Sequence, residues 1–235
     1  MKSTTVLGRG AMAAALLALF AAPAARADGG MIPGGTVGGQ LYKAGTDNLF
    51  VKFIGKQAFY TNDLYFYLTI GGTNQFLFRN TSPTNTTVEV TASSGLATGA
   101  EAIFSICANL DGAAPGTGCT TSNQYFTGPA SRNPDTRFHA VVWTREAYLA
   151  GCALTPTNCA PDVATAISDL TDPGYNLVVG FEDSFNYNID SDFNDLVFAV
   201  RGATTVPEPV TMSLLATGLA GMGGAGLFRR RKPSV

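Results

Sequence analysis

Histidine is almost absent from this chain, since His139 is the only one among 235 residues. The motifs GxSxG and HExxH and the glycine-rich phosphate-binding loop are absent as well. Enzymes built on them need a serine with a histidine base, two zinc-binding histidines or a phosphate cradle, so these three classes are excluded. His139 lies in the apolar run 137–144, where a structural histidine is the better interpretation.

Basic residues are scarce in the central part of the chain. The whole sequence has 15 Lys and Arg against 17 Asp and Glu, a net charge of −2. Seven of the basic residues lie before residue 28 or after residue 209, which leaves 8 basic and 17 acidic residues between them and a net charge of −9. Nucleic-acid binding depends on Lys and Arg that neutralise phosphates. We therefore expect no nucleic-acid partner.

The first 27 residues have the pattern of an export signal. Lys2 and Arg9 precede an apolar stretch at 11–22, and Ala25-Arg26-Ala27 has the small-x-small pattern of a cleavage site. The apolar stretch is shorter than the roughly 20 residues of a spanning helix. The sequence predicts a signal peptide over residues 1–27 and an exported mature chain.

The C-terminal end has a second apolar segment of a different kind. Residues 210–228 carry no charge over 19 residues and precede Arg229, Arg230, Arg231 and Lys232. This length predicts a transmembrane helix, and the basic cluster places its end on the cytoplasmic side. An extended segment, Pro207-Glu208-Pro209, stands directly before the helix.

Together these three parts, over residues 206–232, resemble the PEP-CTERM sorting signal. The resemblance implies processing by exosortase after passage through the export machinery. It also implies transient anchoring in the inner membrane and a final place at the cell surface or in the extracellular matrix. A permanent tail anchor is the alternative.

All four cysteines lie in the part that we expect to be exported: Cys107, Cys119, Cys152 and Cys159. An even number in an oxidising compartment predicts disulfides. Four cysteines allow three pairings, among which the sequence does not choose. We prefer Cys107–Cys119 with Cys152–Cys159, because each pair brackets a loop with Gly, Pro or Asn. A zinc site is the alternative, disfavoured by the absence of CxxC spacing and by the single histidine.

The mature chain is dominated by short strand-like segments. Residues 28–46 contain seven glycines and predict a flexible leader, and residues 47–203 predict one globular domain. Apolar, aromatic-rich runs separated by turns lie at 48–54, 63–70, 75–79, 87–91, 101–107, 137–144, 175–181 and 194–201. Only 160–170 has a helical pattern. We predict an all-β fold, an antiparallel β-sandwich with jelly-roll-like connections.

The stretch 181–195 concentrates oxygen-bearing side chains, with five carboxylates, three Asn and no Lys, Arg or His. Oxygen groups at alternate positions of a turning loop can converge on one point, as in calcium sites with six to eight oxygens. We predict a calcium site here with these ligands: Glu182, Asp183, Asn188, Asp190, Asp192, Asn194 and Asp195. The alternative is that Asp and Asn only form turns and cap backbone groups.

Two parts of this region, 179–183 and 190–198, resemble the closing signature of the domain of unknown function 4114. Upstream the resemblance is weaker and rests on Ala58, Tyr60, Asn62 and Tyr65. It implies a calcium-dependent extracellular β domain that serves adhesion or matrix binding, with an extracellular polysaccharide or a surface protein as partner.

Besides a purely structural matrix component, in which calcium only stiffens the fold, two other functions stay open from the residues alone. The first is a calcium-dependent lectin-like or peptide-binding module in which Phe185, Tyr187 or Trp143 stacks on the ligand. Packing within a strand is the alternative for each ring, and we prefer it for Trp143. The second is a secreted glycoside hydrolase that uses Glu182 and Asp190 as its carboxyl pair. Because any acidic loop offers such pairs and nothing marks one as the acid, we expect a protein that is not an enzyme.

Overall fold

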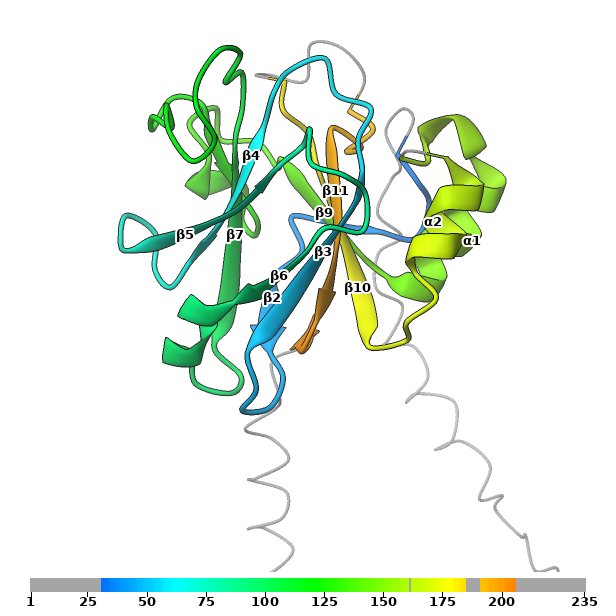
Figure 1. The fold of residues 1–235 in the computed structure, drawn as a ribbon, viewed down its shortest axis with the longest axis horizontal. Coiled ribbons are helices and arrows are strands. Elements are labelled where there is room, and N and C mark those ends of the chain that lie inside the picture. The colour runs from blue at the N-terminus through cyan, green and yellow to red at the C-terminus, as the bar shows by residue number, and fades with distance from the viewer. Residues whose placement is uncertain (1–30, 161, 185–190, 206–235) are drawn as a thin grey trace, which may run out of the picture.

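The protein folds into two antiparallel β-sheets that pack face to face (Figure 1). The computed structural model describes residues 31–160, 162–184 and 191–205. In the first sheet the strands follow one another in this order: β1 (Thr36–Val37), β9 (Ala140–Thr144), β10 (Tyr175–Phe181), β11 (Leu196–Arg201), β3 (Leu49–Gly55) and β6 (Thr87–Val90).

The second sheet is built mainly from the middle of the chain. Its strands follow in this order: β12 (Ala203–Thr204), β2 (Leu41–Lys43), β7 (Glu101–Cys107), β4 (Asp63–Tyr67) and β5 (Asn74–Arg79). Strand β8 (Gln124–Phe126) also pairs with β7. These two sheets confirm the predicted antiparallel β-sandwich, while its jelly-roll connectivity stays a prediction.

Aromatic side chains join the two sheets in the core. Phe104 of β7 packs between Phe66 of β4 and Phe198 of β11, with ring centroids 5.5 and 5.2 Å away. All three rings are fully buried. Burial of one such side chain stabilises the fold by about 1.5–3 kcal/mol, so this aromatic layer holds the sheets together.

Two helices cover the outer face of the first sheet, beside β10 (Figure 1). They are α1 (Arg145–Leu154), capped by Thr144, and α2 (Val163–Asp169), capped by Asp162. Tyr148 of α1 packs on Trp143 of β9 with ring centroids 5.5 Å apart. The first sheet is therefore buried on both faces, which explains why β10 is almost continuously apolar. Short 3₁₀ turns lie at Thr91–Gly95, Ala130–Arg132 and Pro156–Asn158.

The predicted flexible leader is wrong for residues 31–46, because this segment belongs to the sandwich. Leu41 is fully buried in β2, and the Trp143 indole nitrogen donates a 2.9 Å hydrogen bond to the Ile32 carbonyl. A Cβ atom at Gly35 would stand 2.4 Å from the Trp143 ring. Glycine here permits close packing against the indole rather than chain flexibility.

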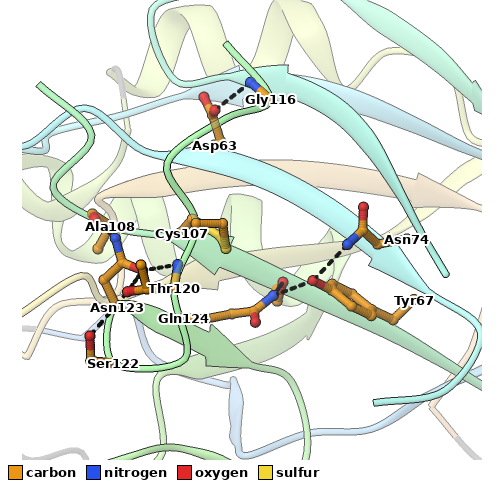
Figure 2. Close-up of a disulfide and its surroundings, with 12 residues drawn as sticks. Asp63, Tyr67, Asn74, Cys107, Ala108, Gly116, Thr120, Ser122, Asn123 and Gln124 are labelled. Carbon is orange, nitrogen blue, oxygen red and sulfur yellow. Dashed lines mark hydrogen bonds between the residues drawn. A yellow bond between two sulfur atoms is a disulfide. The ribbon is translucent and has the colours of Figure 1, made fainter. Parts of the chain in front are cut away.

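Both preferred disulfides are present, Cys107–Cys119 and Cys152–Cys159, and the described chain has no free cysteine. The zinc alternative is therefore wrong. Figure 2 shows Cys107 at the end of β7, where the Thr120 nitrogen donates to Asn123 Oδ1 at 2.7 Å. In the same view the Gly116 nitrogen donates to Asp63 Oδ2 at 2.8 Å. The bond from Gly116 ties the disulfide loop to the start of β4.

Within the described ranges, no helix is long and apolar enough to cross a membrane. The predicted signal peptide, 1–27, and the predicted sorting segment, 206–232, lie outside the described residues.

Candidate metal centre

Three carboxylates gather at one end of the β10–β11 pair. Glu182 and Asp183 directly follow β10, and Asp195 directly precedes β11. Because Phe181 pairs with Leu196 in the antiparallel register, the residues beyond this pair lie side by side. The three side chains each offer one oxygen within 4.8 Å of the others. They are 0, 5 and 7% exposed, so the cluster is buried.

Backbone groups hold the carboxylates in this arrangement. The Asp183 nitrogen donates to Asp195 Oδ2 at 2.7 Å, and the Ser184 nitrogen donates to Glu182 Oε1 at 3.1 Å. The Asp195 nitrogen donates to the Phe181 carbonyl at 3.1 Å, which continues the β ladder into the cluster. The two bonds to Asp195 Oδ2 and Glu182 Oε1 are charge-assisted when the carboxylates are ionised, and such bonds are stronger than neutral ones.

The second sheet contributes Asn62, which precedes β4. Its side chain is fully buried, and its Nδ2 donates to Asp183 Oδ2 at 2.6 Å. Asn80 fixes the backbone of Asn62 by a 3.1 Å bond from the Asn62 nitrogen to Asn80 Oδ1 and a 2.8 Å bond from the Asn80 nitrogen to the Asn62 carbonyl. The Oδ1 atom of Asn62 has no hydrogen-bond partner in the described part of the chain. A buried acceptor in this state costs about 1–3 kcal/mol.

His139 directly precedes β9 and contacts the backbone of the cluster. Its ring nitrogens lie 2.9 Å from the Glu182 carbonyl and 2.9 Å from Asp135 Oδ2, and its ring stacks on Tyr125 at 3.8 Å. The Glu182 nitrogen donates in turn to the His139 carbonyl at 2.9 Å. These contacts agree with a structural histidine that orients the backbone of Glu182.

Burial and mutual repulsion both oppose ionisation of the cluster. Burial, and then the charges of Asp183 and Glu182, raise the pKa of Asp195 to about 10. Burial, followed by the charges of Asp135, Asp183 and Glu182, also raises the pKa of Tyr125 to about 12. Carboxylates this close do not all ionise unless a positive charge balances them. Either protons or a cation must therefore accompany the folded state.

The remaining predicted ligands are placed differently. Asn194 Nδ2 donates to Asp192 Oδ2 at 2.7 Å, to Gln57 Oε1 at 3.2 Å and to the Asn158 carbonyl at 3.2 Å. Asn194 and Asp192 therefore lie beside the segment after β3 and beside the 3₁₀ turn between α1 and α2. Asp192 is not part of the group of three carboxylates. Two more predicted ligands, Asn188 and Asp190, lie outside the described residues.

The turn into β11 depends on a close backbone approach. Ser191 and Phe193 both adopt left-handed conformations, with φ of 57° and 59°. The Phe193 carbonyl oxygen would lie 2.1 Å from a Cβ atom at Gly180. Glycine in β10 therefore lets the turn fold down on the strand and bring Asp195 to Asp183.

The donor set suits a hard cation. Three carboxylates and one amide supply oxygen alone, which calcium and magnesium prefer, whereas zinc and copper prefer imidazole or thiolate. Glu182, Asp183, Asp195 and Asn62 are the described residues that could hold such an ion.

Comparison of the chain with models of protein families, with curated proteins and with solved structures finds no match. The resemblances of the acidic loop and of the C-terminal segment therefore stay predictions.

Proposed function

We propose that this chain is an exported surface or extracellular-matrix protein whose β-sandwich binds calcium at the cluster of Glu182, Asp183 and Asp195. The observation that supports it most is the burial of three carboxylates within 4.8 Å of one another. A divalent cation cancels the repulsion that otherwise forces the site to take up protons.

Calcium suits this site better than magnesium. Calcium accepts six to eight oxygens in irregular geometry, whereas magnesium requires a near-ideal octahedron and usually keeps several waters. Glu182 and Asp183 are adjacent in one limb of the loop, and Asp195 lies in the other, so their oxygens are arranged irregularly around a buried site. Such an arrangement favours calcium, which tolerates irregular geometry.

Adhesion or matrix binding is the role we assign to the calcium-loaded domain. The two disulfides agree with an oxidising compartment. Export through the predicted signal peptide, sorting by exosortase and contact with an extracellular polysaccharide or surface protein complete this proposal. Because the cluster is buried, we assign the ion to the fold rather than to contact with a ligand.

A lectin-like or peptide-binding module is the second candidate, and Phe59 favours it. Its side chain is 89% exposed in the segment between β3 and β4. Gln57 and Asn62 attach this segment to Asn194 and Asp183. Trp143 is buried and does not serve as a stacking surface. Phe185 and Tyr187, the other proposed stacking residues, lie outside the described residues.

Full burial of Glu182 disfavours the glycoside hydrolase.

Thermal unfolding of residues 28–205 with calcium, with magnesium and with EDTA tests the proposed function. This fragment contains every described strand and helix. Calcium at 100 times its Kd stabilises the fold by about 2.7 kcal/mol. For a domain of this size we expect Tm to rise by about 5–10 °C. Equal Tm values in calcium and EDTA would overturn the calcium site.

Screening the calcium-loaded protein on glycan and peptide arrays tests the second candidate. Specific binding that disappears in Phe59→Ala would support a ligand-binding module. Because Phe59 is exposed, this variant is expected to keep its Tm.

A further inference from the structure

Asn62 has an unused oxygen beside the carboxylate cluster. Its Nδ2 lies 2.6 Å from Asp183 Oδ2, while its Oδ1 has no hydrogen-bond partner in the described part of the chain. Because both atoms are bonded to the same carbon, they are about 2.3 Å apart. Oδ1 therefore lies within about 5 Å of the Asp183 oxygen, comparable to the spacing among the carboxylates themselves.

At this spacing one ion can bind both Asn62 Oδ1 and the Asp183 oxygen. Calcium binds oxygens at about 2.3–2.6 Å, so ligands on opposite sides of the ion are up to about 5 Å apart. Amide carbonyls are ordinary calcium ligands. The side chain is also held in place, because Asn80 bonds the backbone of Asn62 at both its nitrogen and its carbonyl.

We propose that Asn62 Oδ1 is a calcium ligand, so that the ion joins the second sheet to the loop of the first. This inference rests on the proposed calcium site and deepens it. Asp183 and Asp195 belong to the β10–β11 pair of the first sheet, whereas Asn62 leads into β4 of the second. The bound ion thus closes one end of the sandwich across its two layers.

Direct titration of calcium separates this role from a simple hydrogen bond to Asp183. In residues 28–205, Asn62→Ala is expected to weaken calcium binding about 10- to 100-fold by calorimetry, the range known for residues that support a metal site. Asn62→Asp, unlike Asn62→Ala, keeps an oxygen ligand at this position. This variant is expected to bind calcium at least as tightly as the unchanged protein.

Asn74→Ala is the matched control. Asn74 lies at the other end of the β4–β5 hairpin, where its Nδ2 donates to the Tyr67 hydroxyl at 3.0 Å (Figure 2). We expect the calcium Kd of Asn74→Ala to stay within about twofold of the unchanged protein, since this amide lies outside the site.

A spectroscopic measurement covers the case in which Asn62→Ala does not fold. In the unchanged protein, the 13Cγ resonance of Asn62 is expected to move when calcium is added, and that of Asn74 is not. If calcium binds and the Asn62 13Cγ resonance stays in place, or if Asn62→Ala binds with unchanged Kd, the role of Asn62 is overturned and the calcium site stands. If the unchanged protein does not bind calcium, the proposed function itself fails.

Discussion

The backbone nitrogen of Asp183 donates a 2.7 Å hydrogen bond to the side chain of Asp195, across the end of the β10–β11 pair. The bond ties the two limbs of the acidic loop and places two carboxylates against each other. Without a cation this geometry costs stability, and with one it becomes a binding site.

Asp195→Asn is therefore expected to have opposite effects in the two states. The amide keeps the acceptor for the Asp183 nitrogen and removes the charge. The free energy of unfolding of the calcium-free protein should therefore rise by roughly 1 kcal/mol or more, and its Tm should rise with it. The same change should weaken calcium binding strongly. Asp172→Asn, at an exposed position, is the control. A variant that lost stability in EDTA, or that kept the calcium Kd, would contradict the role of Asp195.

The pH dependence of stability follows from the raised pKa of Asp195, about 10 in the folded state. The folded, calcium-free protein keeps a proton that the unfolded chain releases above about pH 4. The free energy of unfolding in EDTA should thus lose this contribution as the pH rises from about 4 toward 10, by at most about 1.4 kcal/mol per pH unit. Calcium affinity should increase over the same range, since the ion displaces the proton.

Denaturation curves of the unchanged protein and of Asp195→Asn measure this effect, because titrating groups that do not interact with Asp195 cancel in the difference between them. The difference should increase with pH in EDTA and become independent of pH below about pH 4. Parallel pH profiles would show that Asp195 does not carry the proton.

Gly180→Ala should damage the site without changing a ligand. The added methyl group would meet the Phe193 carbonyl at 2.1 Å and the Trp143 ring at 3.0 Å, so the turn into β11 must move. We expect a loss of about 1–3 kcal/mol in urea unfolding and weaker calcium binding. In the control Gly95→Ala, the new atom would meet Leu68 at 3.4 Å, an ordinary contact. Equal stability of the two variants would contradict the close approach at Gly180.

The sorting prediction is tested in the full chain. Replacing Pro207 and Glu208 by Ala should leave the unprocessed precursor in the inner membrane, because the extended segment before the predicted span is changed. Immunoblots of membrane and released fractions distinguish precursor from product. Unchanged processing would argue for a permanent tail anchor or another signal.

Local sequence was enough to find the carboxylates, because Glu182, Asp183 and Asp195 flank one hairpin loop. It was not enough to make Asn62 a ligand, because this residue lies 121 residues before Asp183 and entered the sequence analysis only through the weaker upstream resemblance. Its proposed role arises only where the second sheet packs against the first. The preferred disulfides could be predicted for the same reason as the carboxylates, because their cysteines are close in sequence, with separations of 12 and 7 residues.

Two errors show where local patterns mislead. The first is helix α1, which the sequence analysis did not predict. It begins at Arg145, immediately after β9, and Thr144 serves both as the last strand residue and as the helix cap. No Gly or Pro marks that boundary. Conversely, the glycines of residues 31–46 indicated flexibility, whereas Gly35 passes so close to the Trp143 ring that a Cβ atom there would stand 2.4 Å from it.

The step from β11 to β12 determines how the domain would respond to a pulling force. After Gly202 the chain leaves the first sheet, and β12 pairs with β2 in the second. Tension applied beyond residue 205 would first unzip the two residue pairs of β12 and then pull on β11 along its length. Strand β11 lies between β10 and β3, so its extraction requires both ladders to shear at once. Asp195 directly precedes the opposite end of β11, and an ion bound there would anchor the strand against that pull.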